Sequence, residues 1–198
     1  MMNGMEERTE GRIAAAIAYV QGLFQNNCGG HDAAHTLRVY RNARHIAELE
    51  PGCDREIVAL AALLHDVDDH KLFSTRNNGN ARAFLAAQGV EPERIDRICQ
   101  VINAVSFSQN KGGRPATPEG RIVQDADRLD AIGAVGIARA FAYGGEHGRT
   151  LEASVAHFHE KLLLLKDLLN TDTARDVAEK RHAFMEEFLA EFTEETEA

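Results

Sequence analysis

Apolar residues recur along most of the chain at the three- and four-residue spacing of amphipathic α-helices. Short stretches rich in Gly, Asn and Pro separate these segments, and such residues end helices. The sequence contains no stretch with the every-second-residue alternation of a half-buried β-strand. The pattern therefore predicts an all-α protein. We expect helices over residues 13–24, 31–49, 55–66, 80–90, 92–105, 121–143, 152–169 and 174–192.

The length of the chain predicts a single domain. A chain of 198 residues can bury a hydrophobic core without disulfides. We expect one helical bundle over residues 1–198, with the motifs that carry chemistry in residues 30–139 and further helices over residues 151–192.

Composition and charge limit the class of partner. Hydrophobic residues make up 44% and charged residues 27%, as in ordinary globular proteins. A net charge of -9 argues against a nucleic-acid partner, because such proteins need Lys and Arg to neutralise phosphates. No apolar run approaches the roughly 18 residues of a membrane span. The polar N-terminus and the widely spaced Cys28, Cys53 and Cys99 predict a cytoplasmic protein with reduced thiols, and a homodimer is left open.

The stretch "LLHDVDDHK" brings ionisable residues to the end of an almost wholly apolar helix. His65 and Asp66 follow "IVALAALL", His35 begins the apolar stripe of the preceding helix, and Asp127 and Asp130 share another stripe. Each alone could be a helix cap or a core residue with a hydrogen-bond partner. Together they suggest one shared divalent cation, because an unpartnered buried carboxylate costs several kcal/mol. Imidazole with carboxylate suits Mn²⁺, Fe²⁺, Co²⁺, Ni²⁺ or Zn²⁺.

Three motifs in this order, "HDAAHTLRV", "LLHDVDD" and "VQDADRLDAIG", resemble the HD superfamily of metal-dependent phosphohydrolases. The resemblance spans Gly30 to Arg139 and implies an HD-type helical bundle. It implies one divalent ion, foremost Mn²⁺, and Mg²⁺ could accompany the substrate. The metal ligands implied by the motifs are His35, His65, Asp66 and Asp127.

The segments "HDVDDHK", "VSFSQNKGG" and "DADRLDAIGAVGIARAFAYGG" resemble more closely the bacterial single-domain nucleotide pyrophosphohydrolases. This likeness implies hydrolysis of a nucleoside or deoxynucleoside triphosphate to the monophosphate and pyrophosphate. It implies that Asp69 orients or deprotonates the attacking water, although related enzymes usually have the longer Glu there. We expect substrate contacts from Arg38, His70, Lys71, Lys111 and Asp130.

Two assignments within the motifs stay open. Asp127 matches the family motif, but Asp125 lies between Ile122 and Leu129 on a more apolar stripe. We expect Asp127 to be the ligand and Asp125 to hold a ligand histidine from behind. His31 could either cap its helix or touch the substrate.

Other functions remain compatible with the sequence. A 5′-nucleotidase or a hydrolase of the alarmone 3′-pyrophosphate would use the same metal site, although alarmone enzymes favour Glu-Asp where this chain has Asp69 and His70. A nucleotide sensor that retains the metal without catalysis is the alternative outside the enzymes. The segment "GGEHGR" after Tyr143 could border the site, and we interpret "HFHEKLLLL" as surface and core edge.

Overall fold

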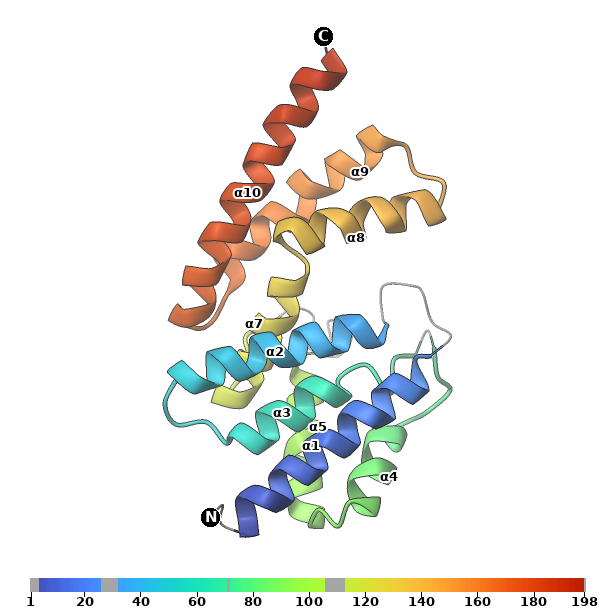
Figure 1. Ribbon diagram of the computed structural model, residues 1–198, viewed down its shortest axis with the longest axis vertical. Helices are drawn as coiled ribbons and strands as arrows, with labels where there is room; N and C mark the ends of the chain where they lie inside the picture. The colour runs from blue at the N-terminus through green and yellow to red at the C-terminus, as the bar shows by residue number, and fades with distance from the viewer. Residues whose placement is uncertain (1–3, 26–31, 71, 106–112, 198) are drawn as a thin grey trace.

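The computed structural model describes residues 4–25, 32–70, 72–105 and 113–197, and within these ranges all regular structure is helical (Figure 1). The prediction of an all-α fold is confirmed. The elements are α1 (Gly4–Leu23), α2 (Ala33–Leu49), α3 (Arg55–Leu64), α4 (Gly79–Ala87), α5 (Pro92–Val105), α7 (Pro118–Asp130), α8 (Gly133–Glu146), α9 (Leu151–His157), a π-helical turn η1 (Phe158–Leu162), a 3₁₀ segment η2 (Leu163–Leu168) and α10 (Asp172–Glu197).

Helix α3 is the centre of the hydrophobic core. Every residue from Ile57 to Leu64 is buried, and the helix packs against α1, α2, α5 and α7. Asp54 caps its start by accepting hydrogen bonds from the backbone N–H groups of Glu56 and Ile57. The helix ends at Leu64, so His65 and Asp66 lie in the following turn, at the edge of the core.

Helices α2 and α7 pack against each other and against α3, which places their polar ends next to the turn after α3. Asp32 caps α2, since its carboxylate accepts a hydrogen bond from the backbone N–H of His35 at 2.6 Å. Thr117 caps α7 in the same way. The caps fix where each helix begins and therefore where its ionisable residues lie.

The helix expected over residues 121–143 is in fact two helices. Helix α7 ends at Asp130 and α8 begins at Gly133, whose φ of +73° favours glycine. A Cβ on Gly136 would lie 2.3 Å from the carbonyl oxygen of Ala131, so the corner also needs glycine there. The helix expected over residues 152–169 likewise divides into α9, η1 and η2.

Helices α8, α9 and α10 form a layer at one end of the molecule (Figure 1). Asp125 of α7 attaches α10 to the core. Its carboxylate accepts hydrogen bonds from the backbone N–H groups of Asn170 (2.9 Å) and Thr171 (2.8 Å), and from both of their side chains. Asp125 is fully buried, and burial raises its pKa, so these bonds offset only part of the desolvation of its charge.

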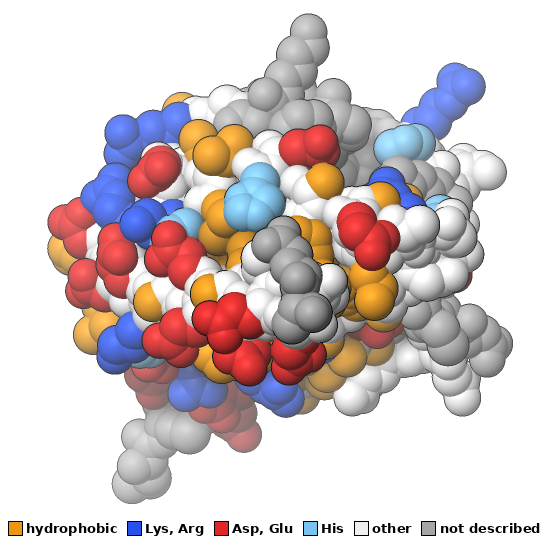
Figure 2. Space-filling model, turned by 90° about the horizontal axis from the view of Figure 1, so that it is seen from above, with side chains coloured by type: hydrophobic (Ala, Val, Ile, Leu, Met, Phe, Trp, Pro, Cys, Tyr) orange, Lys and Arg blue, Asp and Glu red, His pale blue; other side chains and the backbone are white. Residues whose placement is uncertain are grey.

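The surface at this end reflects the acidic composition. Seen from above, acidic side chains are spread over the face, Lys and Arg lie mostly toward its edges, and hydrophobic side chains lie between them (Figure 2). Among the described helices, none combines the length and the apolar character that crossing a bilayer requires.

Candidate metal centre

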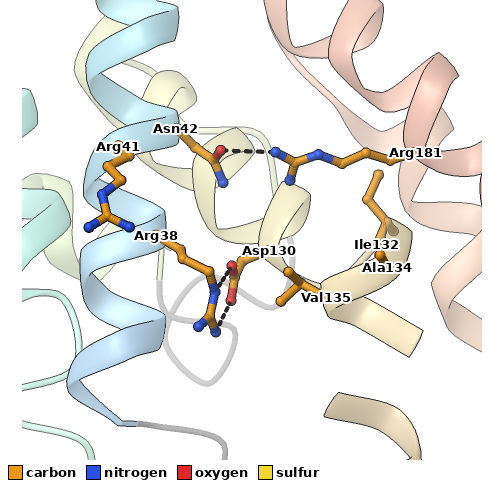
Figure 3. Close-up of a pocket in the computed structure, with 8 residues that line it drawn as sticks. All are labelled: Arg38, Arg41, Asn42, Asp130, Ile132, Ala134, Val135 and Arg181. Atoms are coloured by element: carbon orange, nitrogen blue, oxygen red, sulfur yellow. Dashed lines mark hydrogen bonds and ion pairs between the residues drawn. The ribbon is translucent and has the colours of Figure 1, made fainter. Parts of the chain in front are cut away.

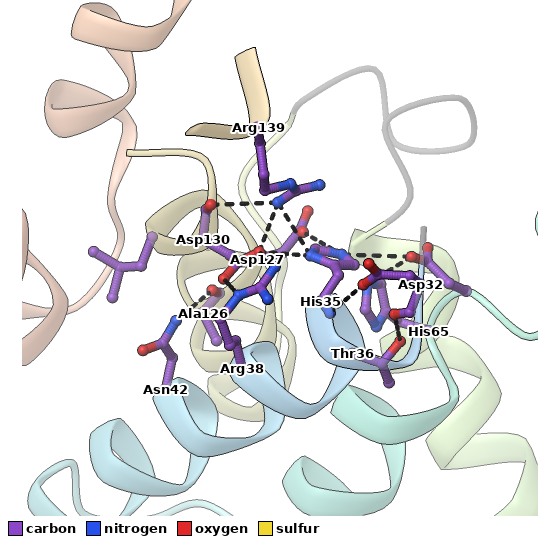
Figure 4. Close-up of polar contacts among 12 residues, drawn as sticks. Asp32, His35, Thr36, Arg38, Asn42, His65, Ala126, Asp127, Asp130 and Arg139 are labelled. Atoms are coloured by element: carbon purple, nitrogen blue, oxygen red, sulfur yellow. Dashed lines mark hydrogen bonds and ion pairs between the residues drawn. The ribbon is translucent and has the colours of Figure 1, made fainter. Parts of the chain in front are cut away.

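The structure brings the four predicted metal ligands together. His35 comes from the first turn of α2, His65 and Asp66 from the turn after α3, and Asp127 from the last turn of α7 (Figure 4). The Nε2 atom of His35 lies 3.5 Å from an oxygen of Asp66 and 3.5 Å from an oxygen of Asp127. The Nε2 atom of His65 lies 3.3 Å from Asp66. Donor atoms on His35, His65 and Asp127 all lie within 4.8 Å of one another.

These separations fit one divalent cation. With metal–ligand bonds of about 2.0–2.2 Å, neighbouring donors lie roughly 3 Å apart and opposite donors about 4 Å apart. The cluster also contains a buried nitrogen that a cation would satisfy, because Nε2 of His65 forms no well-aligned hydrogen bond among the described residues, although an oxygen of Asp66 lies 3.3 Å away. The donor set and this atom fit the cation that the motifs imply.

Both histidines have their other ring nitrogen engaged, so Nε2 is directed to the cluster. Nδ1 of His65 donates to the carbonyl oxygen of Ala62 at 2.9 Å. Nδ1 of His35 lies 2.7 Å from Oδ2 of Asp130, which is only 1% exposed. A carboxylate behind a ligand histidine fixes its tautomer and orientation and strengthens it as a donor.

The electrostatics of the cluster favour positive charge. Burial lowers the pKa of His65, but the carboxylates of Asp66 and Asp127 outweigh it and raise the pKa to about 9. Burial likewise lowers the pKa of His35, but the hydrogen bonds with Asp130 and Asp66 raise it overall. The metal-free cluster therefore attracts a proton to the place where a cation would bind.

Neither Asp125 nor Asp130 lies where it was expected, because Asp130, and not Asp125, contacts a predicted ligand histidine. Residues two positions apart on an α-helix point in directions about 200° apart, so Asp125 faces away from Asp127 and toward α10. Asp130 follows Asp127 by three residues, on the same side of α7, and holds His35. We expected Asp130 to contact substrate directly, whereas the structure places it against Nδ1 of His35, on the far side of that ring from the cluster.

Arg38 and Arg139 surround Asp130. Arg38 forms a two-point ion pair with it, at 2.7 and 3.1 Å, and Nη1 of Arg139 lies 2.6 Å from Oδ2 (Figure 4). Burial raises the pKa of Asp130, but the hydrogen bonds from His35 and Arg38 outweigh it and lower the pKa.

Arg139 was not predicted from the sequence to lie near Asp130, because nine residues along a continuous helix span about 13 Å. The corner between α7 and α8 brings it back.

The remaining predicted residues lie in the turn after α3 or outside the described residues. The backbone N–H of Asp69 donates to the carbonyl of Asp66 at 3.0 Å, so Asp69 closes the turn that begins at the predicted ligand Asp66. His70 is exposed, with Nδ1 3.8 Å from the Asp69 carboxylate. Asp68 caps α4 by accepting from the N–H groups of Asn80 and Ala81. The predicted contacts Lys71 and Lys111 lie outside the described residues, as does His31, for which a cap and a substrate contact were both left open.

A cavity of about 790 Å³ opens beside the centre, between the start of α2 and the helices α8 and α9. Arg139 lines it and lies 3.2 Å from the ring of His35, so the cavity begins next to a predicted ligand. The segment "HFHEKLLLL", which we interpreted from the sequence as surface and core edge, contributes His157 and Lys161 to the wall of this cavity. The polar side chains that line the cavity are Asp32, Arg38, Arg139, Tyr143, Glu146, His147, Arg149, Ser154, His157 and Lys161.

An all-helical fold with a buried His–carboxylate cluster defines a helical metalloprotein with a cavity beside its metal site. The model of the HD domain matches residues 32–132, about half of the chain, and the protein belongs to the HD superfamily of metal-dependent phosphohydrolases. The match includes all four predicted ligands and ends directly before α8.

Relatives match over nearly the whole chain. The uncharacterized protein YpgQ of Bacillus subtilis is 45% identical over 180 residues, which cover 86% of this chain and 87% of YpgQ. The crystal structure of YpgQ in complex with ADP matches with a TM-score of 0.83 and 38% identity, covering 95% of this chain and 96% of that one. An HD-superfamily hydrolase from Bacillus thuringiensis matches with a TM-score of 0.81 and 39% identity, covering 96% and 99%.

Proposed function

We propose that the protein hydrolyses nucleoside or deoxynucleoside triphosphates to the monophosphate and pyrophosphate, with one divalent ion held by His35, His65, Asp66 and Asp127. The observation that carries the proposal is the cation-lined cavity whose lining residue Arg139 lies 3.2 Å from the ring of His35, one of these four residues. Mixed nitrogen and oxygen donors suit Mn²⁺ well, and we propose it as the ion.

The charge of the cavity supports a phosphate-rich substrate. Arg38, Arg139, Arg149 and Lys161 line it, whereas Asp32 and Glu146 are the only carboxylates among its described lining residues. This excess of positive charge lies in a protein with a net charge of -9, so it is local. A volume of about 790 Å³ is within the range of small-molecule sites and suits a nucleotide.

The side chains of Tyr143, His147 and Arg149 in the cavity wall favour a substrate with a nucleobase. The ring of Tyr143 is 45% exposed and stacks on His147, with centroids 3.8 Å apart and planes inclined by 19°. The guanidinium of Arg149 lies 5.1 Å from the same ring. Exposed aromatic faces of this kind stack on bases. The relative YpgQ has been crystallised in complex with ADP, which is a nucleotide, and we extend that ligand class to the present protein.

The roles of the residues follow from these positions. When bound, the divalent ion would act as a Lewis acid toward the water nucleophile and the phosphoryl oxygens. Asp69, in the turn directly after Asp66, would accept the proton of the attacking water. Arg38 and Arg139 would stabilise negative charge on the phosphate groups. Asp130 would keep Nε2 of His35 directed at the cluster.

Product analysis tests the reaction. The purified protein would be incubated with nucleoside mono-, di- and triphosphates and an alarmone in the presence of Mn²⁺, Co²⁺ or Mg²⁺, and products identified by chromatography and phosphorus NMR. We expect triphosphates to give monophosphate and pyrophosphate. Orthophosphate from monophosphates would instead indicate a 5′-nucleotidase, and nucleotide binding without products would indicate a sensor.

The substitution Asp69→Asn tests the mechanism. It preserves size but removes the proton acceptor, so kcat should fall about 10²–10⁴-fold while metal content and nucleotide binding are retained. The control is Asp68→Asn, which weakens the cap of α4 and should lower thermal stability with kcat near that of the wild type. Equal kcat values for Asp69→Asn and the wild type would remove Asp69 from the mechanism.

A further inference from the structure

A second, smaller cavity is also lined by Arg38. It has a volume of about 320 Å³ and lies between α2, the corner that joins α7 to α8, and α10 (Figure 3). Among the residues lining the two cavities, Arg38 alone lines both. The polar side chains around the smaller cavity are Arg38, Arg41, Asn42, Asp130 and Arg181.

The arginines reach the cavity from two helices. Arg38, Arg41 and Asn42 follow the i, i+3, i+4 spacing that places side chains on one helix face. Arg181 of α10 approaches from the opposite wall, where its Nη2 donates to Oδ1 of Asn42 at 3.1 Å (Figure 3). Its Nη1 donates to the carbonyl oxygen of Leu129.

Positive charge exceeds negative charge in this cavity. Asp130 is its only carboxylate among the described lining residues, and it is already bound by Arg38, Arg139 and His35. Arg181 has neutral oxygen atoms as partners, and burial lowers its pKa although a guanidinium stays charged at neutral pH. Arg41 has no hydrogen bond or ion pair within the part of the chain that the structure describes.

We infer that this cavity binds a phosphate-type anion, either inorganic phosphate or the phosphate group of a small phosphomonoester, at a site separate from the metal centre. Guanidinium groups match the oxygens of such anions with paired hydrogen bonds. The volume, near the lower end for small-molecule sites, suits a small anion better than a whole nucleotide.

The start of α8 adds to the three arginines. Ala134 and Val135, in the first turn of this 14-residue helix, line the cavity, and Ile132 at the cap position supplies no side-chain acceptor. The first N–H groups of a helix and its dipole favour an anion. The smaller cavity shares Arg38 and Asp130 with the proposed nucleotide reaction, so the test uses Arg41, which lines only the smaller cavity and has no role in that reaction.

Calorimetric titration of the full-length protein with inorganic phosphate tests the site. The informative variant is Arg41→Gln, whose side chain is exposed and has no described partner, so the fold should be unaffected. We expect phosphate to bind the wild type and to bind Arg41→Gln about tenfold more weakly, as for the loss of a charge-assisted hydrogen bond. The matched control is Arg44→Gln on the same helix, which loses surface contacts with Glu48 and Tyr40 but lines neither cavity, and it should bind like the wild type.

A second pair of measurements identifies the source of the anion and separates the cavities. Arg149→Gln changes only the larger cavity, so the binding that depends on Arg41 should persist in it. Titration with a nucleoside monophosphate would show whether a larger phosphomonoester also enters. The inference is overturned if Arg41→Gln binds phosphate like the wild type, if the wild type binds none, or if Arg149→Gln abolishes the same binding.

Discussion

Asp125 and Asp127, which are two residues apart on α7, face different parts of the molecule. Asp127 is 39% exposed and faces the predicted metal ligands, whereas Asp125 is fully buried and holds the start of α10. The sequence motif could predict Asp127 as the ligand. It could not predict the role of Asp125, because its partners Asn170 and Thr171 lie 45 and 46 residues away and carry no pattern of their own.

Substitution of these two aspartates should therefore have different effects. Asp127→Asn should reduce metal retention strongly and leave the unfolding of the metal-free protein nearly unchanged. Asp125→Asn should retain the metal but lower the free energy of unfolding by roughly 2–4 kcal/mol, because buried donors lose a charged acceptor. Elemental analysis and urea denaturation in chelator measure the two effects. Loss of metal from Asp125→Asn alone would reverse the assignment.

The residues that gather in the His–carboxylate cluster could be predicted, because each lies at the end of an apolar helical stripe and within a family motif. Arg139 could not be, since its approach to Asp130 depends on a corner that periodicity does not show. Ala, Ile and Val continue the helical pattern through residues 131–137, and Gly133 and Gly136 alone indicate the break. An isolated glycine in a helical pattern is compatible with either a continuous helix or a turn, so the sequence left this open.

At the scale of elements, the corner between α7 and α8 gives a second prediction. Gly136→Ala would bring a Cβ to 2.3 Å from the carbonyl oxygen of Ala131, so the backbone must move. We expect the free energy of unfolding to fall by about 1–3 kcal/mol. Gly145→Ala, in the same helix, meets no neighbour within 4 Å and should stabilise the protein by about 0.5–1 kcal/mol. Equal urea midpoints for the two variants would show that the corner tolerates a side chain.

At the scale of the whole molecule, the metal centre connects α2, α3 and α7, which all contribute to the core around α3. An ion that binds only the folded chain stabilises it by about 2.7 kcal/mol at a hundredfold excess over Kd. For a protein of this size, removal of the ion by a chelator should therefore lower Tm by about 5–10 °C.

Differential scanning calorimetry with and without chelator measures this shift. His65→Ala provides the control, because a variant without the metal should melt at the same temperature in both buffers. An unchanged Tm for the wild type after confirmed removal of the metal would mean that the ion does not bind the folded chain in preference to the unfolded chain, which would contradict the predicted site.

The predicted metal ligands come from α2, the turn after α3, and α7, whereas α8, α9 and α10 form much of the walls of both cavities. Under the proposed function, mutations in these C-terminal helices would alter which phosphate compound is accepted without changing the predicted metal ligands. Natural selection can act on recognition and on chemistry separately in such a molecule. Related proteins could diverge in metabolic role through the last third of the chain while the reaction itself is inherited unchanged.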